Sequence, residues 1–558
     1  MRSPSKASSQ SSRSSQEQTP DKHVDIEKDA IYRDEAPSRP GSIGSGVAGP
    51  SSTKTVLRFP PGDPENPYNW SAWKKAAAVF CVISTVLNST MGSSLPSGAS
   101  AQLAAYFGVH SQLELVLPTS IFLVGYVFGP LVFGPLSEHY GRKGVMCACL
   151  FTLALFTMAC ALAPTWAALI AFRFVCGACG SCPIAVVGGI CADIYSDPTS
   201  RGRSMAVFMA ATCFGPLVGP IISGYTAPIS WRWPFWIALI LAGITFVLLC
   251  LIPETYGPVL LKRRARRLRK QSGGKDDVWA QIELEESSWR HIFTVVLMRP
   301  LRMIVFEPLV LFTCIYTALI YAMLYMFFQA YPIIYEGIYN FTPGQTGLAL
   351  IPIGIGSSIA CGMYLYYDKL LARARARDAP WSRSVEMRRL PLGCVAGPFI
   401  VAGLFWAGWT ASASIHWLAP VSAGVSFGIG FLLVFMSLIN MLVDAYDVFA
   451  ASALAAASTF RSLFGAVLPF ATTPMYERLG VAWACSLLGF LTLAMCVIPF
   501  AFVRYGELMR RKSRFCRYLE EKRREEEEER ARGREEERGG ECADGESRGA
   551  RDRGDDVV

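Results

Sequence analysis

The chain has 558 residues, of which 52% are hydrophobic, and its formal net charge is +9. A soluble chain of this length would divide into several domains with polar surfaces. Here the apolar residues gather into runs of about 18 to 25 residues, the length needed to cross roughly 30 Å of hydrocarbon. Strands of a transmembrane β-barrel alternate polar and apolar residues in shorter segments, which excludes that class. We therefore expect an all-α polytopic membrane protein.

Five parts follow one another along the chain. We expect a disordered cytosolic N-terminal arm at 1–75, a six-helix half at 76–252, a cytosolic central loop at 253–306, a second six-helix half at 307–503 and a charged cytosolic tail at 504–558. The arm is Ser-rich and has no signal peptide, so the first membrane helix should direct insertion. Its last stretch, from Asp63 to Trp70, carries prolines and aromatics that could dock the arm against the membrane face.

Twelve apolar runs are long enough to be membrane helices. The expected spans are 76–96, 114–133, 145–163, 167–190, 204–224, 235–252, 307–328, 346–367, 391–410, 416–440, 450–472 and 481–503. The second half echoes the first weakly, because Asp368 and Lys369 follow span 8 as Glu138 and Arg142 follow span 2. This repetition predicts two pseudo-symmetric halves.

Lys and Arg concentrate in the connectors after spans 2, 4, 6 and 8, whereas the other side holds only Arg232 and Arg478. Cytosolic loops of membrane proteins are enriched in these residues, so both chain ends are expected in the cytosol. The same distribution argues against a nucleic-acid partner. We expect the plasma membrane, since no feature points to a vacuole. The 17 cysteines do not form a disulfide framework, because all but Cys516 and Cys542 lie within apolar runs.

A Gly-rich charged connector joins spans 2 and 3, at Phe133 to Gly144. It resembles the signature loop between helices 2 and 3 of the major facilitator superfamily, roughly Gly-x-x-x-Asp-Arg-x-Gly-Arg-Lys, with a Glu in place of the usual Asp. The resemblance implies a cytosolic gate in which charges of this loop pair with acids at neighbouring helix ends; alternatively, they only enforce topology. The gate residues are Gly134, Glu138, Gly141, Arg142, Lys143 and Asp193.

Two arginines lie inside apolar spans, Arg173 in span 4 and Arg461 in span 11. A guanidinium at that depth costs several kcal/mol unless it faces a wet cavity or a partner. Arg173 could therefore line the cavity, biasing protonation of a nearby group or holding an anionic part of the substrate, or it could be structural and satisfied by backbone carbonyls. It also matches the family's Arg-x-x-x-Gly pattern on helix 4, which implies proton coupling. Asn440 is a further cavity candidate.

Span 5 contains a repeated Gly-Pro pattern that permits close helix contact and favours a bend. It resembles the Gly-Pro-x-x-Gly-Pro-x-x-Gly-Gly motif that marks antiporters within the superfamily, and Ser223 replaces the first glycine of the final pair. The implied role is a hinge or seal on the outer side; the alternative is ordinary helix packing. Its residues are Gly215, Pro216, Gly219, Pro220 and Gly224.

Span 7 carries aromatics on one face, because Tyr321, Tyr325, Phe328 and Gln329 recur at three- and four-residue spacing. Aromatic rings with polar tips suit a pocket for amphipathic solutes, although they also suit simple packing. Asn340 begins an N-glycosylation sequon in an expected outer loop.

These patterns, together with Pro253 to Leu261 and Tyr331 to Thr342, resemble the fungal 12-helix drug:proton antiporters of the superfamily. The resemblance implies a monomeric exporter of drugs, toxins or secondary metabolites, driven by the proton gradient and using no other cofactor. Polyamines or organic acids are alternative cargoes. No metal site, phosphate loop or catalytic cluster is apparent. A nutrient symporter, a membrane enzyme and a receptor-like sensor remain as competing hypotheses.

Overall fold

The computed structural model describes residues 55–60, 62–271, 278–284, 298–446, 449–513 and 515–518, together with residues 521, 524, 525 and 528 of the tail. The expected disordered arm as far as Lys54, the tail from 529 onward and Asp447 lie outside the described residues.

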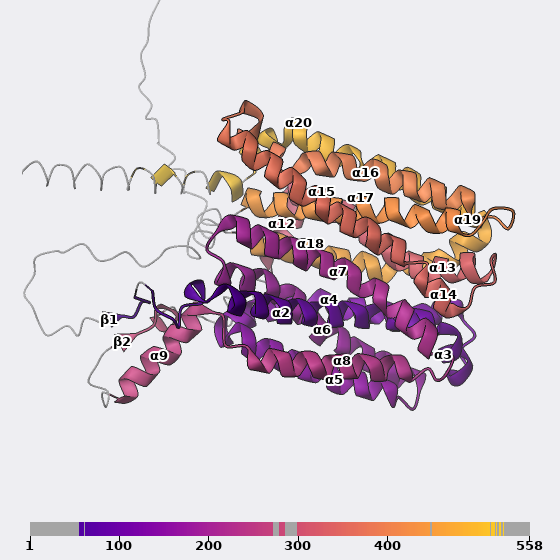
Figure 1. Cartoon of the computed structure of the whole chain (residues 1–558), viewed down its shortest axis with the longest axis horizontal. Coiled ribbons are helices and arrows are strands. Elements are labelled where there is room, and N and C mark those ends of the chain that lie inside the picture. Colours follow the sequence, from indigo (N-terminus) through magenta and orange to yellow (C-terminus); the bar gives the residue numbers. More distant parts are fainter. Residues whose placement is uncertain are drawn as a thin grey trace, which may run out of the picture. The chain divides into compact units, whose positions relative to one another are not determined.

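The first half is a bundle of long helices that run alternately in opposite directions (Figure 1). It contains six long helices and one short one: α2 (Ala72–Ser94), α3 (Ser100–Phe107), α4 (Gln112–Tyr140), α5 (Arg142–Ala161), α6 (Trp166–Ile194), α7 (Pro198–Thr226) and α8 (Trp233–Leu251). A 3-10 turn, η2 (Leu95–Ala99), joins α2 to α3. Most of these helices extend several residues beyond the spans expected from hydropathy, because their ends carry polar turns that continue the helix outside the apolar run.

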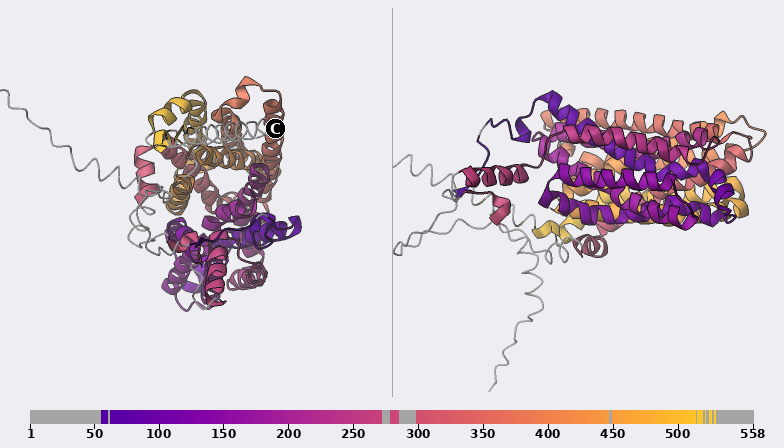
Figure 2. Two further views of the ribbon diagram at one scale, coloured as in Figure 1. Left: turned by 90° about the vertical axis from the view of Figure 1, so that its left-hand side faces the viewer. Right: turned by 90° about the horizontal axis from the view of Figure 1, so that it is seen from below.

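The second half repeats this arrangement. Its elements are α13 (Pro308–Tyr331), the π-helical turn η4 (Pro332–Glu336), α14 (Pro343–Leu348), α15 (Ile351–Ala376), η5 (Pro380–Arg383), α16 (Val385–Thr410), α17 (Leu418–Tyr446), α18 (Ala450–Val467), η7 (Leu468–Ala471), α19 (Thr472–Met495) and α20 (Val497–Lys512). Viewed along the helices, the two halves form separate groups, indigo to magenta and orange to yellow (Figure 2).

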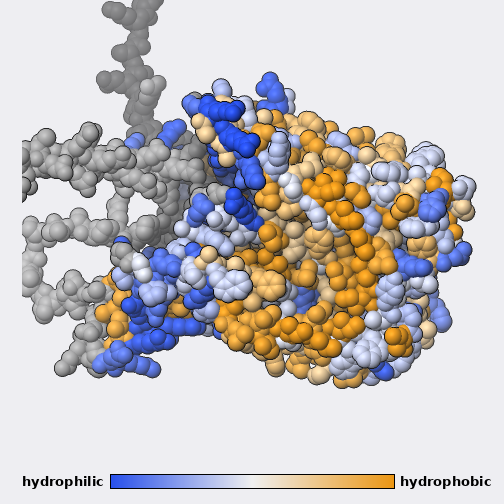
Figure 3. All heavy atoms as spheres, viewed as in Figure 1, coloured by the Kyte–Doolittle hydropathy of each residue, from blue (hydrophilic) through white to orange (hydrophobic). Residues whose placement is uncertain are grey.

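Eleven continuous segments of the described chain are long and apolar enough to cross a membrane. The last of them covers 63 residues, Ala450–Lys512. At about 1.5 Å per residue it is far longer than one crossing needs, and it is interrupted at Gly480, whose φ of +73° is not helical. This segment therefore contains spans 11 and 12. The expected polytopic all-α architecture is confirmed, and an apolar belt covers the helices between more polar ends (Figure 3).

The central loop and the end of the N-terminal arm pack against each other. The loop contains α9 (Gly257–Gln271), β2 (Val278–Trp279), α10 (Gln281–Leu284) and α12 (Met298–Phe306). The arm contributes β1 (Thr55–Val56), which pairs in parallel with β2, and η1 (Pro67–Asn69). Asp63 forms an ion pair with Arg264 of α9 at 2.5 Å. The docking expected for this stretch is therefore made to the central loop and, through η1, to the end of α6.

The two halves meet along a seam. On this seam α4 of the first half packs against α18 of the second, and α7 packs against α14 and α15. We call the end of the molecule that carries Arg142, α9 and Arg389 the basic end, and the end that carries η2, η4 and α14 the opposite end. Small residues permit the close approach at the opposite end, where Gly224 contacts the backbone of Pro343 and Gly347 contacts Pro220.

Candidate functional site

Aromatic hydroxyls from α13 meet α2 at the middle of the seam. The Ser93 and Tyr325 hydroxyls are 2.7 Å apart, and the Tyr325 and Tyr321 hydroxyls are 3.2 Å apart. In the first half, the Ser89 hydroxyl lies 2.5 Å from that of Tyr126. All of these rings are buried. The structure therefore brings Tyr321 and Tyr325 to the interface between the halves, with hydroxyls that can hydrogen-bond across it.

A small pocket lies further along the seam, toward the opposite end. Phe328 lines it together with Pro220 of the Gly-Pro pattern, whereas Gln329 is half-buried and lies outside its lining. The pocket holds about 30 Å³, the volume of one or two water molecules. It is therefore too small for an organic solute in this conformation.

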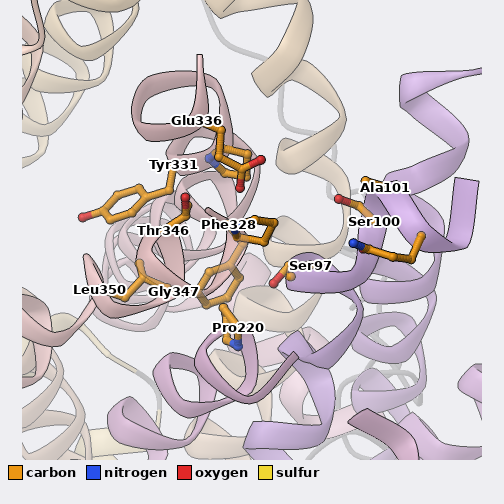
Figure 4. Close-up of a pocket in the computed structure, with 14 residues that line it drawn as sticks. Ser97, Ser100, Ala101, Pro220, Phe328, Tyr331, Glu336, Thr346, Gly347 and Leu350 are labelled. Atoms are coloured by element: carbon orange, nitrogen blue, oxygen red, sulfur yellow. The ribbon is translucent and has the colours of Figure 1, made fainter. Parts of the chain in front are cut away.

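Glu336 also lines this pocket, and sequence reasoning did not single it out (Figure 4). The residue follows the tyrosine-rich stretch after span 7, in an apparent loop. In the structure it ends the π-helical turn η4, which continues α13 and turns this carboxyl toward the residues of η2 and α14. The sequence did contain a signal for Glu336, namely a carboxyl between spans 7 and 8.

Arg173 is buried, and each nitrogen of its guanidinium donates a hydrogen bond to a backbone carbonyl. Its Nε donates to Pro118 O at 2.9 Å, and its Nη1 and Nη2 donate to Gly92 O at 2.8 Å and Ser93 O at 3.1 Å. Two of these carbonyls belong to the last turn of α2, where helix carbonyls lack partners and the helix dipole is negative. The guanidinium also lies 4.4 Å from the Phe122 ring centroid. These contacts match the structural alternative for Arg173.

Arg461 is buried in a different environment, 8% exposed at the seam. Its guanidinium lies over the rings of Tyr321 and Phe435, at 5.0 and 5.6 Å from their centroids. Among the described residues it makes one hydrogen bond, from Nη2 to Ser458 Oγ at 3.3 Å, and its Nε has no hydrogen-bond partner. The two arginines that look equivalent in sequence are therefore satisfied to very different degrees.

Asn440 lies toward the basic end, away from this centre. Its amide donates to the Tyr364 hydroxyl at 3.2 Å and to Met436 O at 2.7 Å. The Tyr364 hydroxyl also accepts from Arg389, which pairs with Asp444 at 3.3 Å. Asn440 thus belongs to a charged network of the second half.

The charges of the signature connector form a matching network in the first half. Arg142 pairs with Asp193 at 3.2 Å and with the more exposed Glu138 at 3.4 Å, as the resemblance implied. Its backbone N–H donates to the buried carboxylate of Glu254 at 2.9 Å, and Lys143 Nζ donates to Cys250 O at 2.7 Å. The partners described for Arg142 belong to the first half and to the start of the central loop, so the network joins helix ends of that half to the loop that follows it.

Gly141 explains why the connector needs a glycine. Its φ of +101° is unfavourable for residues with a Cβ, and a Cβ there would collide with the Glu254 carboxylate. Gly134, by contrast, has open space around it.

The counterpart of Arg142 in the second half is Arg389, in the first turns of α16. It is not Lys369, because α15 continues past that residue to Ala376.

The Gly-Pro pattern of span 5 lies on α7 and packs against α2 and then α14. Cβ atoms added at Gly215 and Gly219 would collide with Thr90 and Ser94 of α2. The Ser94 hydroxyl donates to Pro216 O at 2.8 Å. Gly224 and Pro220 lie at the seam of the opposite end, so this pattern serves both intra-half packing and contact between the halves.

Asn340 lies at the opposite end, and its glycosylation remains a prediction. It is exposed and has a φ of +55°, a conformation that Asn tolerates better than most residues. Among the described residues no group of three or more His, Cys, Asp or Glu side chains could hold a metal ion.

Comparison with known proteins agrees with this architecture. The Major Facilitator Superfamily profile matches residues 81–469. Among solved structures, the proton:xylose symporter XylE superposes with a TM-score of 0.57 and 15% identity, covering 78% of this chain and 97% of XylE. That similarity concerns the fold.

Fungal relatives match most of the chain. Efflux pump FUB11 of Gibberella moniliformis is 38% identical over 468 residues, 83% of this chain and 78% of the relative. MFS-type efflux pump MFS2 of Trichophyton rubrum is 37% identical over 472 residues, 84% of this chain and 78% of the relative. The citrinin biosynthesis cluster MFS transporter mrr1 of Monascus ruber is 38% identical over 463 residues, 82% of this chain and 91% of the relative. The chain is a multi-pass membrane protein that belongs to the Major Facilitator Superfamily.

Proposed function

We propose that this protein is a proton-driven exporter of small organic molecules, such as drugs, toxins or secondary metabolites. Its two halves rock about a central site, so that the site opens in turn to the cytosol and to the outside. In this proposal both termini are cytosolic and the protein lies in the plasma membrane as a monomer. The names of the fungal relatives, which include efflux pumps, support export.

The closed seam at the opposite end supports alternating access. There α7 contacts α14 through backbone atoms, at Gly224 with Pro343 and at Gly347 with Pro220. Such contacts leave no path for a solute, because glycines bring two backbones together without intervening side chains. Release on that side therefore requires α7 and α14 to separate.

The proposal of proton coupling rests on a carboxyl at this seam. Glu336 lines the small pocket between the halves, and the other polar side chains lining it are neutral: Ser97, Ser100, Gln102, Thr346 and Tyr331. Arg173 and Arg461 cannot serve as proton carriers, because a guanidinium does not deprotonate in proteins. Glu336 can be neutral when the seam is closed and ionised when the seam opens to water, which links proton movement to the conformational cycle.

The test uses the purified full chain in proteoliposomes with an imposed pH gradient. Three fluorescent probes share a naphthalene ring: naphthalene-2-sulfonate, naphthalene-2-sulfonamide and (naphthalen-2-ylmethyl)trimethylammonium. We expect the gradient to drive uphill movement of at least one probe opposite to the proton flow, and Glu336→Gln to abolish uphill movement while retaining probe exchange. Glu477→Gln, which alters an exposed acid at the same end, is the control.

Two outcomes would refute separate parts of the proposal. A wild-type protein that moves no probe in response to the gradient would refute proton-driven export. Unchanged uphill movement by Glu336→Gln would show that another group carries the proton.

A further inference from the structure

Three polar groups within four residues of α18 lack hydrogen-bond partners among the described residues. They are Thr459 Oγ1, Arg461 Nε and Ser462 Oγ, all inaccessible to solvent. Buried polar groups are nearly always paired, because an unpaired group loses its hydrogen bonds to water without replacing them. Many buried hydroxyls of this protein bond to a carbonyl of the preceding helical turn, as Thr212 and Thr317 do. The other described hydroxyls without a partner, those of Ser120, Thr255, Thr313 and Thr472, are isolated from one another, whereas those on α18 are clustered.

The cluster faces the seam. α18 packs against α4 of the first half and against α13 and α17 of the second. Ser458, Arg461 and Ser462 share a helical face, since they are three and four residues apart. One turn further, Gly465 contacts Tyr321 from α13 and Leu123 from α4. Arg461 and Ser462 thus lie where a solute between the halves would be held, whereas Thr459, two residues before Arg461, lies on the other side of α18.

The charge of the cluster is not balanced by a described acid. The described ion pairs of the second half join Arg388 and Arg389 to Asp444, Arg510 to Glu386 and Arg511 to Glu507, and Arg461 takes part in none of them. Arg173 shows what a structural arginine looks like in this protein, with three carbonyls around it. A buried guanidinium without such partners is costly to retain.

We propose that Arg461 and Ser462 form the recognition site for an anionic group, a carboxylate or a sulfonate, on the transported molecule. The guanidinium and the hydroxyl are hydrogen-bond donors that match acceptor oxygens. The rings of Tyr321 and Phe435, which lie against the guanidinium, supply a surface for the apolar part of the same molecule. This inference rests on the proposed transport of small organic molecules and names their class as amphipathic organic anions.

Equilibrium binding to the purified full chain in lipid nanodiscs tests the inference without any gradient. The probes are naphthalene-2-sulfonate, its neutral sulfonamide and the trimethylammonium analogue, which share the naphthalene ring and differ mainly in charge. We expect the sulfonate to bind at least tenfold more tightly than the other two. Arg461→Gln should remove this preference, and Arg461→Lys should retain part of it, because an ammonium keeps the charge without the planar fork.

Two hydroxyl variants keep the test independent of folding. Thr459→Val and Ser462→Ala remove groups that have no partner among the described residues, so they should leave the melting temperature unchanged or raise it. Ser462→Ala should nevertheless weaken sulfonate binding several-fold and leave sulfonamide binding unaffected, whereas Thr459→Val, two residues from Arg461 and on the other side of α18, should leave both unchanged. Arg478→Gln, an exposed arginine of the same half, is the control for net charge.

Equal binding of the three probes, absence of sulfonate binding, or an unaltered preference in the Arg461 and Ser462 variants would overturn the inference. Equilibrium binding involves no proton gradient, so these outcomes do not depend on whether export is proton-driven. The proteoliposome experiment detects a failure of proton-driven export.

Discussion

Replacing Arg173 and Arg461 separately by methionine should change stability to very different extents. Both side chains are buried, at 2% and 8% exposure, and both lie in apolar helices. Methionine retains much of the length and packing of either side chain while removing the charge. The pair therefore compares a satisfied guanidinium with an unsatisfied one in the same protein.

The magnitude follows from the hydrogen bonds. Arg173 donates three hydrogen bonds to carbonyls. Bonds to a charged group contribute about 1.5–3 kcal/mol each, or roughly 4.5–9 kcal/mol for three. Burial of the guanidinium offsets several kcal/mol of this sum. We expect Arg173→Met to lower the free energy of unfolding by about 3 kcal/mol, in the range seen when one partner of a buried charged contact is removed.

Arg461 has one hydrogen bond, at 3.3 Å, and contacts to two rings. A hydrogen bond and cation–π contacts of this kind contribute about 1–3 kcal/mol together, comparable to the cost of burying the charge. Arg461→Met should therefore leave the free energy of unfolding within about 1 kcal/mol of the wild-type value or raise it. Thermal unfolding of both variants in nanodiscs, followed by tryptophan fluorescence, measures the difference. A stable Arg173→Met protein, or equal destabilisation of both variants, would refute this reasoning.

Two further predictions concern other contacts. Gly219→Leu should destabilise the protein by at least about 1–3 kcal/mol, because its Cβ would collide with Ser94. The control is Gly243→Ala, at a helical glycine with open space around it. This substitution should leave the melting temperature unchanged or slightly higher. The Glu65 backbone N–H, followed by Arg264, lowers the pKa of Asp63 below its ordinary value of 3.8. The contribution of Asp63 to docking of the arm is therefore present above pH 3.8 and lost as the pH falls through the lowered pKa. Hydrogen exchange of residues 55–70 should be slow at pH 7 in the wild type and faster at that pH in Asp63→Asn, and equal exchange in the two proteins would contradict a role for this pair.

Part of the candidate site follows from local patterns. The Gly, Glu and Arg residues of the connector after span 2 predicted a charged network at one membrane face, and Arg142 does pair with Glu138 and Asp193. The role of this network in gating remains a prediction. Glu254, which is 4% exposed and binds the backbone at the start of α5, was not singled out because its partners lie 111 and 112 residues away in the chain.

The sequence by itself determined the class of this protein, its crossings and its family, because hydrocarbon thickness imposes a minimum length on each apolar run and the motifs are local strings. It could not decide which of two buried arginines is structural. That depends on which carbonyls the neighbouring helices present, and only the packing of α6 against α2 and α4 gives Arg173 its three partners while the seam leaves Arg461 with one. In the sequence, Glu336 looks like a loop residue. Only the tertiary structure places its carboxyl between the halves, because the π-helical turn after α13 directs it toward the seam.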